Sequence, residues 1–339
     1  MHSDFEVAVV GAGIIGLTTA ALFAERGIDT LLVEQSRCGF AGATAHTGGI
    51  CRAFEPNPQL AWLAEVVGFE PGETHVESIL RAHETTTGAL YRLPPAFTQA
   101  PYDTRVQAIS AQAAASLLGR THMDTGVYYH EPGAAISDVH ATMSSLRTTL
   151  RKRASVIEHC TVQRLVEGDA HVDVHGLETH YRARHVINAA GASSPTLSAV
   201  DGAEVRTIPH FKLRGPTVPT LPCIDFVSGN YLLPLSAELL QSSTTLRPSL
   251  AQIADDPGRL PRMVEDCKLR LCALVENIEE YQLLSMGLAL DLYTPDGLPR
   301  LGPCRPGSRI WLATGLNGIG YKYAYPIATR LYERITQQR

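Results

Sequence analysis

The sequence predicts an α/β fold with two domains interleaved along the chain, and three observations support this. A strand pattern at the N-terminus runs into a glycine-rich turn and a helix, as at the start of a doubly wound parallel sheet. The same order of strand, glycine loop and helix returns at 309–335. Between them, stretches of 207–286 alternate apolar and polar residues, as antiparallel strands do. A length of 339 residues suits about two domains.

Composition and charge exclude several classes of protein. The chain is 45% hydrophobic and 19% charged with no low-complexity tract, which excludes fibrous and disordered proteins. A net charge of -5 gives no basic field, so we expect no nucleic-acid partner. The 7 cysteines are scattered without a C-x-x-C pair, which argues against disulfides and a zinc site. These cysteines and the acidic start of the chain predict a cytoplasmic protein without a bound metal.

The uncharged run from Val7 to Ala24 decides the N-terminal interpretation. Its length imitates a membrane span, but three glycines divide it into a strand and a helix. Gly11 suits the tight turn, Gly13 the approach of a pyrophosphate, and Gly16 the close packing of helix on strand. The amides and dipole at the start of the helix favour phosphate. We therefore predict a dinucleotide site and no membrane span.

A second strand at 29–33 ends at Glu34, at the spacing expected of an acidic residue that binds ribose hydroxyls. This context does not by itself choose between NAD and FAD. The loop at 38–52 is rich in small residues, which lets the backbone come close to a large planar ligand. The strand at 184–191 ends in small residues and glycine, as expected where a sheet meets a cofactor.

These features in this order resemble a known family. The glycine turn with Glu34, the loop at 46–52, the strand at 186–191, and the motif at 294–299 followed by 318–322 look like the FAD-dependent D-amino-acid oxidase superfamily. Within it, the chain is most similar to the monomeric sarcosine oxidase and glycine oxidase branch. The resemblance implies FAD, bound by a Rossmann-like domain that is interleaved with an α+β substrate domain built on an antiparallel sheet.

The resemblance also assigns residues to the cofactor and ranges to the domains. The turn and Glu34 would hold the ADP half, and the loop and the C-terminal glycine turn would enclose the flavin ring. The expected cofactor-binding residues are Gly11, Gly13, Ile14, Ile15, Gly16, Glu34, Gln35, Thr44, Ala45, His46, Val162, Ala190, Gly191, Gly315, Asn317, Gly318, Gly320, Tyr321 and Lys322. The expected FAD-binding domain comprises 1–56, 126–206 and 287–339, and the substrate domain 57–125 and 207–286.

Arg52 and Lys322 stand where the sarcosine oxidase branch has an Arg and a Lys that bind the substrate carboxylate. The assignment makes chemical sense, because a guanidinium offers a planar fork and an ammonium a compact second charge. The alternative that each pairs with an acidic neighbour stays open. His46, Tyr231 and Tyr293 are candidates to orient the amine, with ordinary packing roles as the alternative. Without a second basic or acidic cluster, a neutral or small amino acid is favoured.

Two departures from the family pattern matter. Members that attach FAD covalently carry a Cys at the position of Asp291, so we expect non-covalent FAD. The branch also uses a Lys near the flavin edge for reaction with oxygen, whereas 239–244 contains none; Lys212, on another strand, is a candidate substitute. Whether the acceptor is oxygen or another oxidant is therefore open.

The expected function is oxidation of the C–N bond of an amino acid or N-substituted amino acid. Hydride would pass to flavin N5 and leave an imine that hydrolyses. The alternatives are an FAD-dependent 2-hydroxy-acid dehydrogenase, a non-catalytic FAD-binding partner subunit and an NAD-dependent dehydrogenase. Four histidines within 171–185 suggest a metal site, but alternation with valine favours the polar face of a hairpin.

Overall fold

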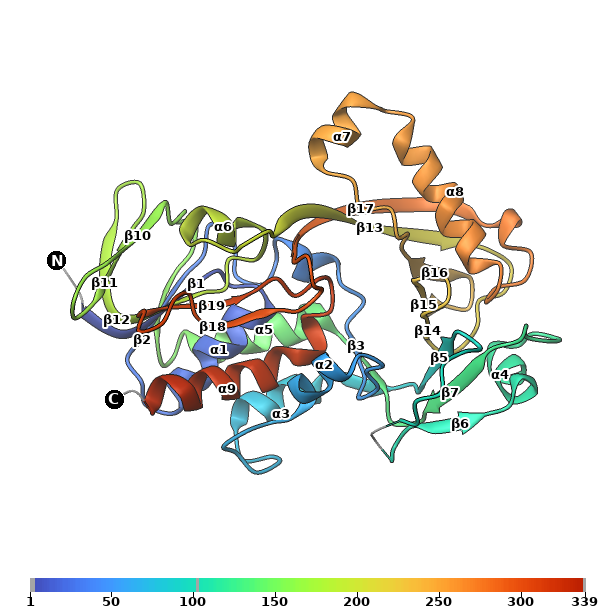
Figure 1. Cartoon of the computed structure of the whole chain (residues 1–339), viewed down its shortest axis with the longest axis horizontal. Coiled ribbons are helices and arrows are strands. Elements are labelled where there is room, and N and C mark those ends of the chain that lie inside the picture. Colours follow the sequence, from blue (N-terminus) through green and yellow to red (C-terminus); the bar gives the residue numbers. More distant parts are fainter. Residues whose placement is uncertain (1–3, 102–103, 338–339) are drawn as a thin grey trace.

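The computed structural model describes residues 4–101 and 104–337, which form two large sheets at opposite ends of an elongated molecule (Figure 1). The first sheet has the order β10-β11-β12-β1-β2-β9, with β19 paired to β12 and β18 to β19. Its strands are β1 (Asp4–Val10), β2 (Thr30–Val33), β9 (Ser155–Ile157), β10 (Arg164–Glu167), β11 (Val172–His175), β12 (His180–Asn188), β18 (Arg300–Pro303) and β19 (Ile310–Thr314). The predicted α/β class is confirmed.

The centre of the first sheet is parallel, as the sequence predicts. β1 pairs in parallel with both β2 and β12, and β12 pairs in parallel with β19. Helix α1 packs against α3, α5 and α9 on one face. These helices are α1 (Ile14–Glu25), α3 (His75–Ala82), α5 (Val139–Leu150) and α9 (Ala324–Thr336).

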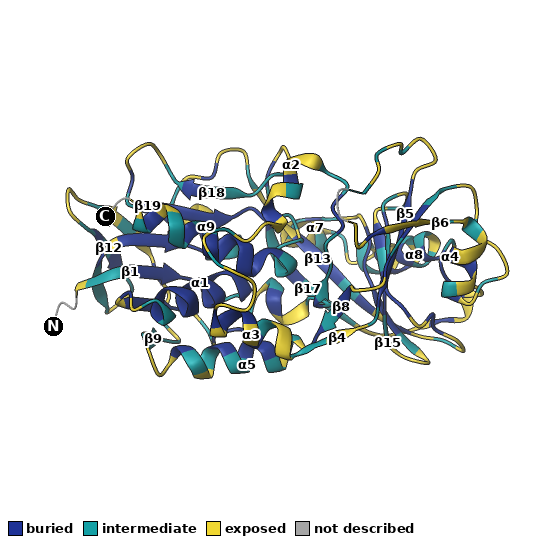
Figure 2. Ribbon diagram, turned by 90° about the horizontal axis from the view of Figure 1, so that it is seen from below, coloured by how far each residue is buried: buried dark blue, intermediate teal, exposed yellow. Residues whose placement is uncertain are grey.

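The N-terminal uncharged run is strand β1, a turn and helix α1. Residues 14–24 of α1 are all buried, and Figure 2 shows this burial around α1 and β1. A helix enclosed on every side needs no polar face, which explains why the run resembles a membrane span in composition. Among the described residues, no helix has the length and apolarity to cross a membrane.

The second sheet has the order β17-β13-β16-β15-β14-β5-β7-β6. Its strands are β5 (Ala89–Leu93), β6 (Gln107–Ile109), β7 (Val127–Glu131), β13 (Glu204–Arg214), β14 (Cys223–Asp225), β15 (Asn230–Ser236), β16 (Leu239–Ser242) and β17 (Gln282–Tyr293). The long antiparallel pair β13 and β17 runs from the first sheet to the second (Figure 1). Its ends near 291–293 therefore lie beside the cofactor-binding half.

Short elements complete the fold. A small sheet joins β3 (Ile50–Cys51), β8 (Ala135–Ser137) and β4 (Glu84–Thr86). The remaining helices are α2 (Pro58–Ala61), α4 (Ala111–Leu118), α6 (Ser194–Leu197), α7 (Leu250–Asp255) and α8 (Arg259–Leu271). The 3-10 turns are η1 (Ala43–His46), η2 (Trp62–Ala64), η3 (Gly191–Ser193), η4 (Ile278–Glu280) and η5 (Tyr321–Tyr323).

The expected domain ranges cut across two sets of contacts. Helix α3 lies within 57–125, yet it packs on α1 and α5 of the first sheet. Strand β7 lies within 126–206, yet it pairs with β5 and β6 of the second sheet. We propose a division that follows the sheets, with α3 in the cofactor half and β7 in the substrate half.

Candidate functional site

The turn between β1 and α1 is built for close approach of an anion. Gly11 has φ +96°, and a Cβ there would lie 2.5 Å from the carbonyl oxygen of Ala189. A Cβ at Gly16 would lie 1.9 Å from the carbonyl oxygen of Gly11. Gly13, the residue before α1, has no side chain to cap the helix, and the first turn holds no acidic residue. The first amides of the helix are thus available to phosphate, apart from Ile14, whose N–H donates to Thr44 Oγ1 at 3.0 Å.

Glu34 lies at the end of β2, where it contacts the same turn. Its Oε2 accepts from the amide of Ala12 at 2.6 Å, and its Oε1 accepts from the amide of Ser36 at 2.8 Å. The side chain is buried, and the carbonyl oxygen of Glu34 accepts from the amide of Cys160. This hydrogen bond places the segment that begins at Cys160, and with it the buried Val162, beside Glu34. Gln35, in contrast, is exposed.

The C-terminal glycine turn meets the end of β17. Asn317 takes a left-handed conformation, and its Oδ1 accepts from the amide of Thr294 at 2.9 Å. The amide of Gly318 donates to Asp291 Oδ2 at 2.8 Å. Burial raises the pKa of Asp291, although this bond and the amide of Leu292 lower it. The turn is therefore tied to the strand at Asp291, the position for which the sequence resemblance implies a Cys in members that attach FAD covalently.

Arg52 and Lys322 come together, as the resemblance implies, but around an acidic residue. Lys322 Nζ lies 2.9 Å from Glu55 Oε2, and the hydroxyl of Tyr323 donates to the same oxygen at 2.9 Å. An Arg52 terminal nitrogen lies 4.0 Å from it. The side chains of Arg52, Glu55 and Lys322 are 9%, 7% and 5% exposed. This is the pairing alternative left open by the sequence, here buried.

A second buried carboxylate fixes the chain next to these cations. Glu131 on β7 accepts from the amides of Ala53 at 2.8 Å and Phe54 at 3.1 Å. It also accepts from the hydroxyl of Tyr91 at 2.6 Å. We call Arg52, Lys322, Glu55 and Glu131 the paired cluster, because it holds two cations and two carboxylates. Sequence reasoning missed both glutamates; the spacing of Glu55 three residues after Arg52 is the one signal available.

Burial and charge set the protonation of the paired cluster. Burial lowers the pKa of Lys322 to about 7, and repulsion from Arg52 acts in the same direction. Glu55 opposes both effects by pairing with the ammonium. Burial acts to raise the pKa of Glu55, but Lys322 and Arg52 together bring it below its usual value. Glu55 is therefore ionised near neutral pH, while Lys322 is poised between its charged and neutral forms.

A second group of polar side chains lies where the second sheet faces loop 44–52. We call it the sheet cluster; its members are His46, His210, Tyr231, Gln241, Arg247 and Tyr293. The hydroxyl of Tyr231 accepts from Gln241 Nε2 at 3.1 Å and lies 3.1 Å from His210 Nδ1. Gln241 Nε2 also donates to the carbonyl of His46 at 3.4 Å, and the His46 and His210 rings stack with centroids 6.2 Å apart.

The sheet cluster contains one permanent charge. Burial, His46 and Arg247 lower the pKa of His210 to about 4, so it is neutral near pH 7. Burial raises the pKa of Tyr231 to about 12, so its phenol stays protonated. The guanidinium of Arg247 supplies the charge. Lys212 lies on β13 with an exposed side chain and is not a member of the cluster. His210, Gln241 and Arg247 carry no motif by which the sequence identifies them.

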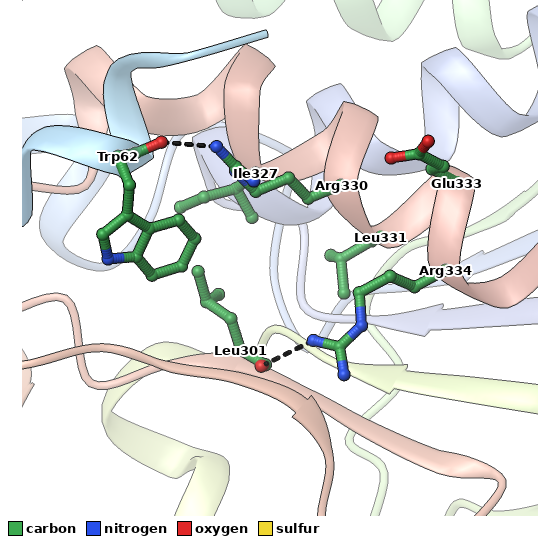
Figure 3. Close-up of a pocket in the computed structure, with 7 residues that line it drawn as sticks. All are labelled: Trp62, Leu301, Ile327, Arg330, Leu331, Glu333 and Arg334. Atoms are coloured by element: carbon green, nitrogen blue, oxygen red, sulfur yellow. Dashed lines mark hydrogen bonds between the residues drawn. The ribbon is translucent and has the colours of Figure 1, made fainter. Parts of the chain in front are cut away.

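A cavity among the described residues lies elsewhere. It measures about 100 Å³ and lies between α9, β18 and Trp62, with Arg330 and Arg334 at its sides (Figure 3). Arg330 donates to the carbonyl of Trp62 and Arg334 to that of Leu301. No predicted site residue lines it. Nor does any group of three or more His, Cys, Asp or Glu within the described ranges have the geometry to hold a metal ion.

Comparison with known proteins decides the family. The family model for DAO, described as FAD dependent oxidoreductase, matches residues 6–334. The chain belongs to the DAO family of FAD-dependent oxidoreductases. This DAO-family chain is 28% identical to glycine oxidase of Pseudomonas aeruginosa over 91% of its own length and 88% of that relative. It is 23% identical to mitochondrial dimethylglycine dehydrogenase of Homo sapiens, of which it spans 41%.

Solved structures show the DAO fold over the whole chain. L-Proline dehydrogenase from P. horikoshii superposes with a TM-score of 0.79, at 15% identity and with coverage of 100% of this chain and 95% of that one. Glycine oxidase from Geobacillus kaustophilus gives 0.74, at 18% identity and with coverage of 100% and 96%. The DAO family is a family of FAD enzymes, which overturns the NAD and non-catalytic alternatives. The glycine turn, the uncapped start of α1 and Glu34 fit the ADP half of FAD.

Proposed function

We propose that this oxidoreductase oxidises the C–N bond of an amino acid or N-substituted amino acid, leaving an imine that water hydrolyses. FAD, held by the glycine turn and Glu34, would supply the acceptor for the α-hydrogen at its N5. The observation that carries the proposal is the convergence of Arg52, Lys322 and Tyr323 on one carboxylate oxygen of Glu55. These donors can hold a carboxylate, and the sequence resemblance implies that the segment of Lys322 lies beside the flavin.

A substrate carboxylate would take the place of Glu55 at this position. Arg52 Nη1 donates to the carbonyl of Phe54, and Lys322 Nζ lies 3.5 Å from the same oxygen, so both side chains are held in place before a ligand arrives. Such placement lowers the entropic cost of binding. Because neutral Lys322 attracts a carboxylate less than its protonated form does, binding should weaken as the pH rises above about 7.

The sheet cluster would orient the amine. An amine must be neutral to give up the α-hydrogen, and a protonated Tyr231 can donate to its lone pair or accept from its N–H. His46 and the hydroxyl of Tyr293 are the other polar groups that we assign to this wall. None of these side chains needs to act as a strong base, because a substrate can bind in its neutral amine form.

The test is anaerobic mixing of the yellow protein with two matched panels. The amino acids are glycine, sarcosine, D-alanine, L-proline and D- and L-glutamate, and the hydroxy acids are glycolate and D- and L-lactate. We expect at least one amino acid to bleach the visible flavin band and the hydroxy acids to leave it unchanged. Bleaching by hydroxy acids alone would establish the 2-hydroxy-acid dehydrogenase alternative. Repeating turnover with a dye and with oxygen then identifies the acceptor.

We further propose that FAD is bound non-covalently. The supporting observation is that Asp291, at the position of the attaching Cys, is a carboxyl bound by backbone amides. Acid precipitation of the protein should release all of the yellow colour into the supernatant. Colour that stays in the pellet would contradict this proposal.

A further inference from the structure

We propose that Arg247, together with the hydroxyl of Tyr293, forms a second anion-binding position in the substrate site. It takes a second carboxylate of the substrate, so that the preferred substrate is a dicarboxylic amino acid. The inference rests on the proposed function and revises the expectation of a neutral or small substrate, which followed from the lack of a second basic cluster in the sequence.

The first argument is that Arg247 has only neutral partners. Its Nε donates to the hydroxyl of Tyr293 at 3.3 Å, and its Nη1 donates to Ser243 Oγ at 3.3 Å and to the carbonyl of Thr244. Among residues 4–101 and 104–337, no carboxylate forms an ion pair with it, and Nη2 makes no hydrogen bond. A half-buried guanidinium with a free edge is suited to accept a carboxylate from a ligand.

The two arginines nearest to this position differ from Arg247 because each is paired with a carboxylate. Arg206 lies with its guanidinium carbon 5.7 Å from the centroid of the same Tyr293 ring, but it pairs with Glu204 at 2.8 Å. Arg270 pairs with Asp266 at 2.7 Å. Asp266 feels the charge of Arg247, yet its oxygen is already engaged by Arg270 and by the hydroxyl of Thr244. Glu204 and Asp266, the acids next to these two arginines, therefore already have basic partners.

The second argument is location. The hydroxyl of Tyr293 lies 3.3 Å from where a Cβ on Gly318 would stand, which places the Arg247 partner against the glycine turn. Arg247 also acts electrostatically on His210 and Tyr231, so its charge faces the sheet cluster. A ligand held beside the turn would thus lie within the field of this guanidinium.

The third argument is that the same two segments join the two cationic positions. Loop 46–52 starts at His46, which stacks on His210 of the sheet cluster, and ends at Arg52 of the paired cluster. The turn starts at Gly318 next to Tyr293, and its chain reaches Lys322 four residues later. A ligand lying along these segments would meet Arg247 at one end and Arg52 with Lys322 at the other. A ligand with two carboxylates would therefore bind at both cationic positions.

The experiment compares propionate with succinate, which has the same chain and one more carboxylate. Both are unreactive, and each is titrated into the FAD-loaded protein by calorimetry and by the change in flavin absorbance. In the wild type we expect succinate to bind about tenfold more tightly, the ratio expected of one added charge-assisted hydrogen bond. In Arg247→Gln the ratio should fall to about one, and in Arg247→Lys to an intermediate value.

Arg206→Gln is the matched control, because Arg206 contacts the same aromatic ring but is already paired. Its succinate to propionate ratio should equal that of the wild type. A wild-type ratio near one, or an unchanged ratio in Arg247→Gln, would overturn the inference. The flavin spectrum of each variant verifies folding. Failure of the proposed function is a separate result, since it would show as the absence of bleaching by every amino acid, independent of these unreactive ligands.

Discussion

The paired cluster and the sheet cluster each place cations next to the expected flavin position, but they differ in what balances the charge. In the paired cluster, Arg52 and Lys322 face Glu55 and Glu131 in a nearly dry environment. In the sheet cluster, Arg247 meets hydroxyl and carbonyl oxygens alone. Buried cations with acidic partners can bind a ligand only in exchange for one of those partners, whereas a cation with neutral partners is directly available to a ligand.

The largest expected effect is on stability and separates the two clusters. Arg52→Met removes the permanent cation beside Glu55 and leaves two buried carboxylates against Lys322. We expect the free energy of unfolding to fall by about 3 kcal/mol or more. Arg247→Met should cost about 1 kcal/mol, because its partners are neutral and it is half-buried. Urea unfolding of the FAD-loaded variants measures both; equal losses would remove the distinction.

The next effect is the pH dependence of stability that Lys322 contributes. Its pKa is about 7 in the folded protein and near its ordinary value of 10.5 in the unfolded chain, so the unfolded chain binds more protons between these values. Stability must therefore rise with pH across this window, by at most about 1.4 kcal/mol per pH unit. Lys322→Met should lack this rise when its unfolding is measured from pH 7 to 9. Parallel curves for the two proteins would show that Lys322 keeps its charge.

The same titration should appear in ligand binding at one cluster and not at the other. Propionate affinity should decrease as the pH rises above about 7, by at most about tenfold per pH unit, because neutral Lys322 attracts a carboxylate less. The additional affinity of succinate should stay constant over this range, since a guanidinium is permanently charged. Calorimetry at several pH values measures both. If the additional affinity of succinate over propionate disappeared at high pH, this affinity would come from Lys322 and not from Arg247.

The smallest expected effect concerns the orientation of the Arg247 guanidinium. Tyr293→Phe removes the hydroxyl that accepts from Arg247 Nε at 3.3 Å. The guanidinium should keep its charge but lose one fixed direction, so succinate should weaken about threefold to tenfold while propionate is unchanged. A matched change, Tyr231→Phe, alters a hydroxyl that is not bonded to Arg247. Equal effects of the two variants on the ligand ratio would contradict the pairing.

The sequence predicts best what depends on local chain geometry. The order of Gly11, Gly13 and Gly16 predicts the strand, turn and helix, because those positions tolerate no side chain or need a left-handed turn. The sequence also predicts that Arg52 and Lys322 lie together, but this prediction comes from the family motif and not from the spacing of the two residues. Glu131 escaped prediction since it reaches Ala53 and Phe54 from a distant strand, and no local pattern records that contact.

Arg247 escaped prediction for the opposite reason. Its significance lies in the absence of a carboxylate partner, and a sequence does not state which charges are paired in space. The division into domains depends on the same kind of information: α3 and β7 are ordinary local elements, and only tertiary packing assigns each to a sheet. Which charges are paired, and which elements pack together, is determined by the three-dimensional structure and cannot be read from the order of residues along the chain.

The most direct measurement is a crystal structure of the FAD-loaded protein with an unreactive dicarboxylate such as succinate bound. We predict one carboxylate within hydrogen-bond distance of Arg52 and Lys322, with Glu55 displaced, and the other within hydrogen-bond distance of Arg247. The ligand should lie over the flavin ring between them. A ligand bound elsewhere, or a flavin ring out of reach of both clusters, would contradict the assignment of this site to the oxidation of an amino acid.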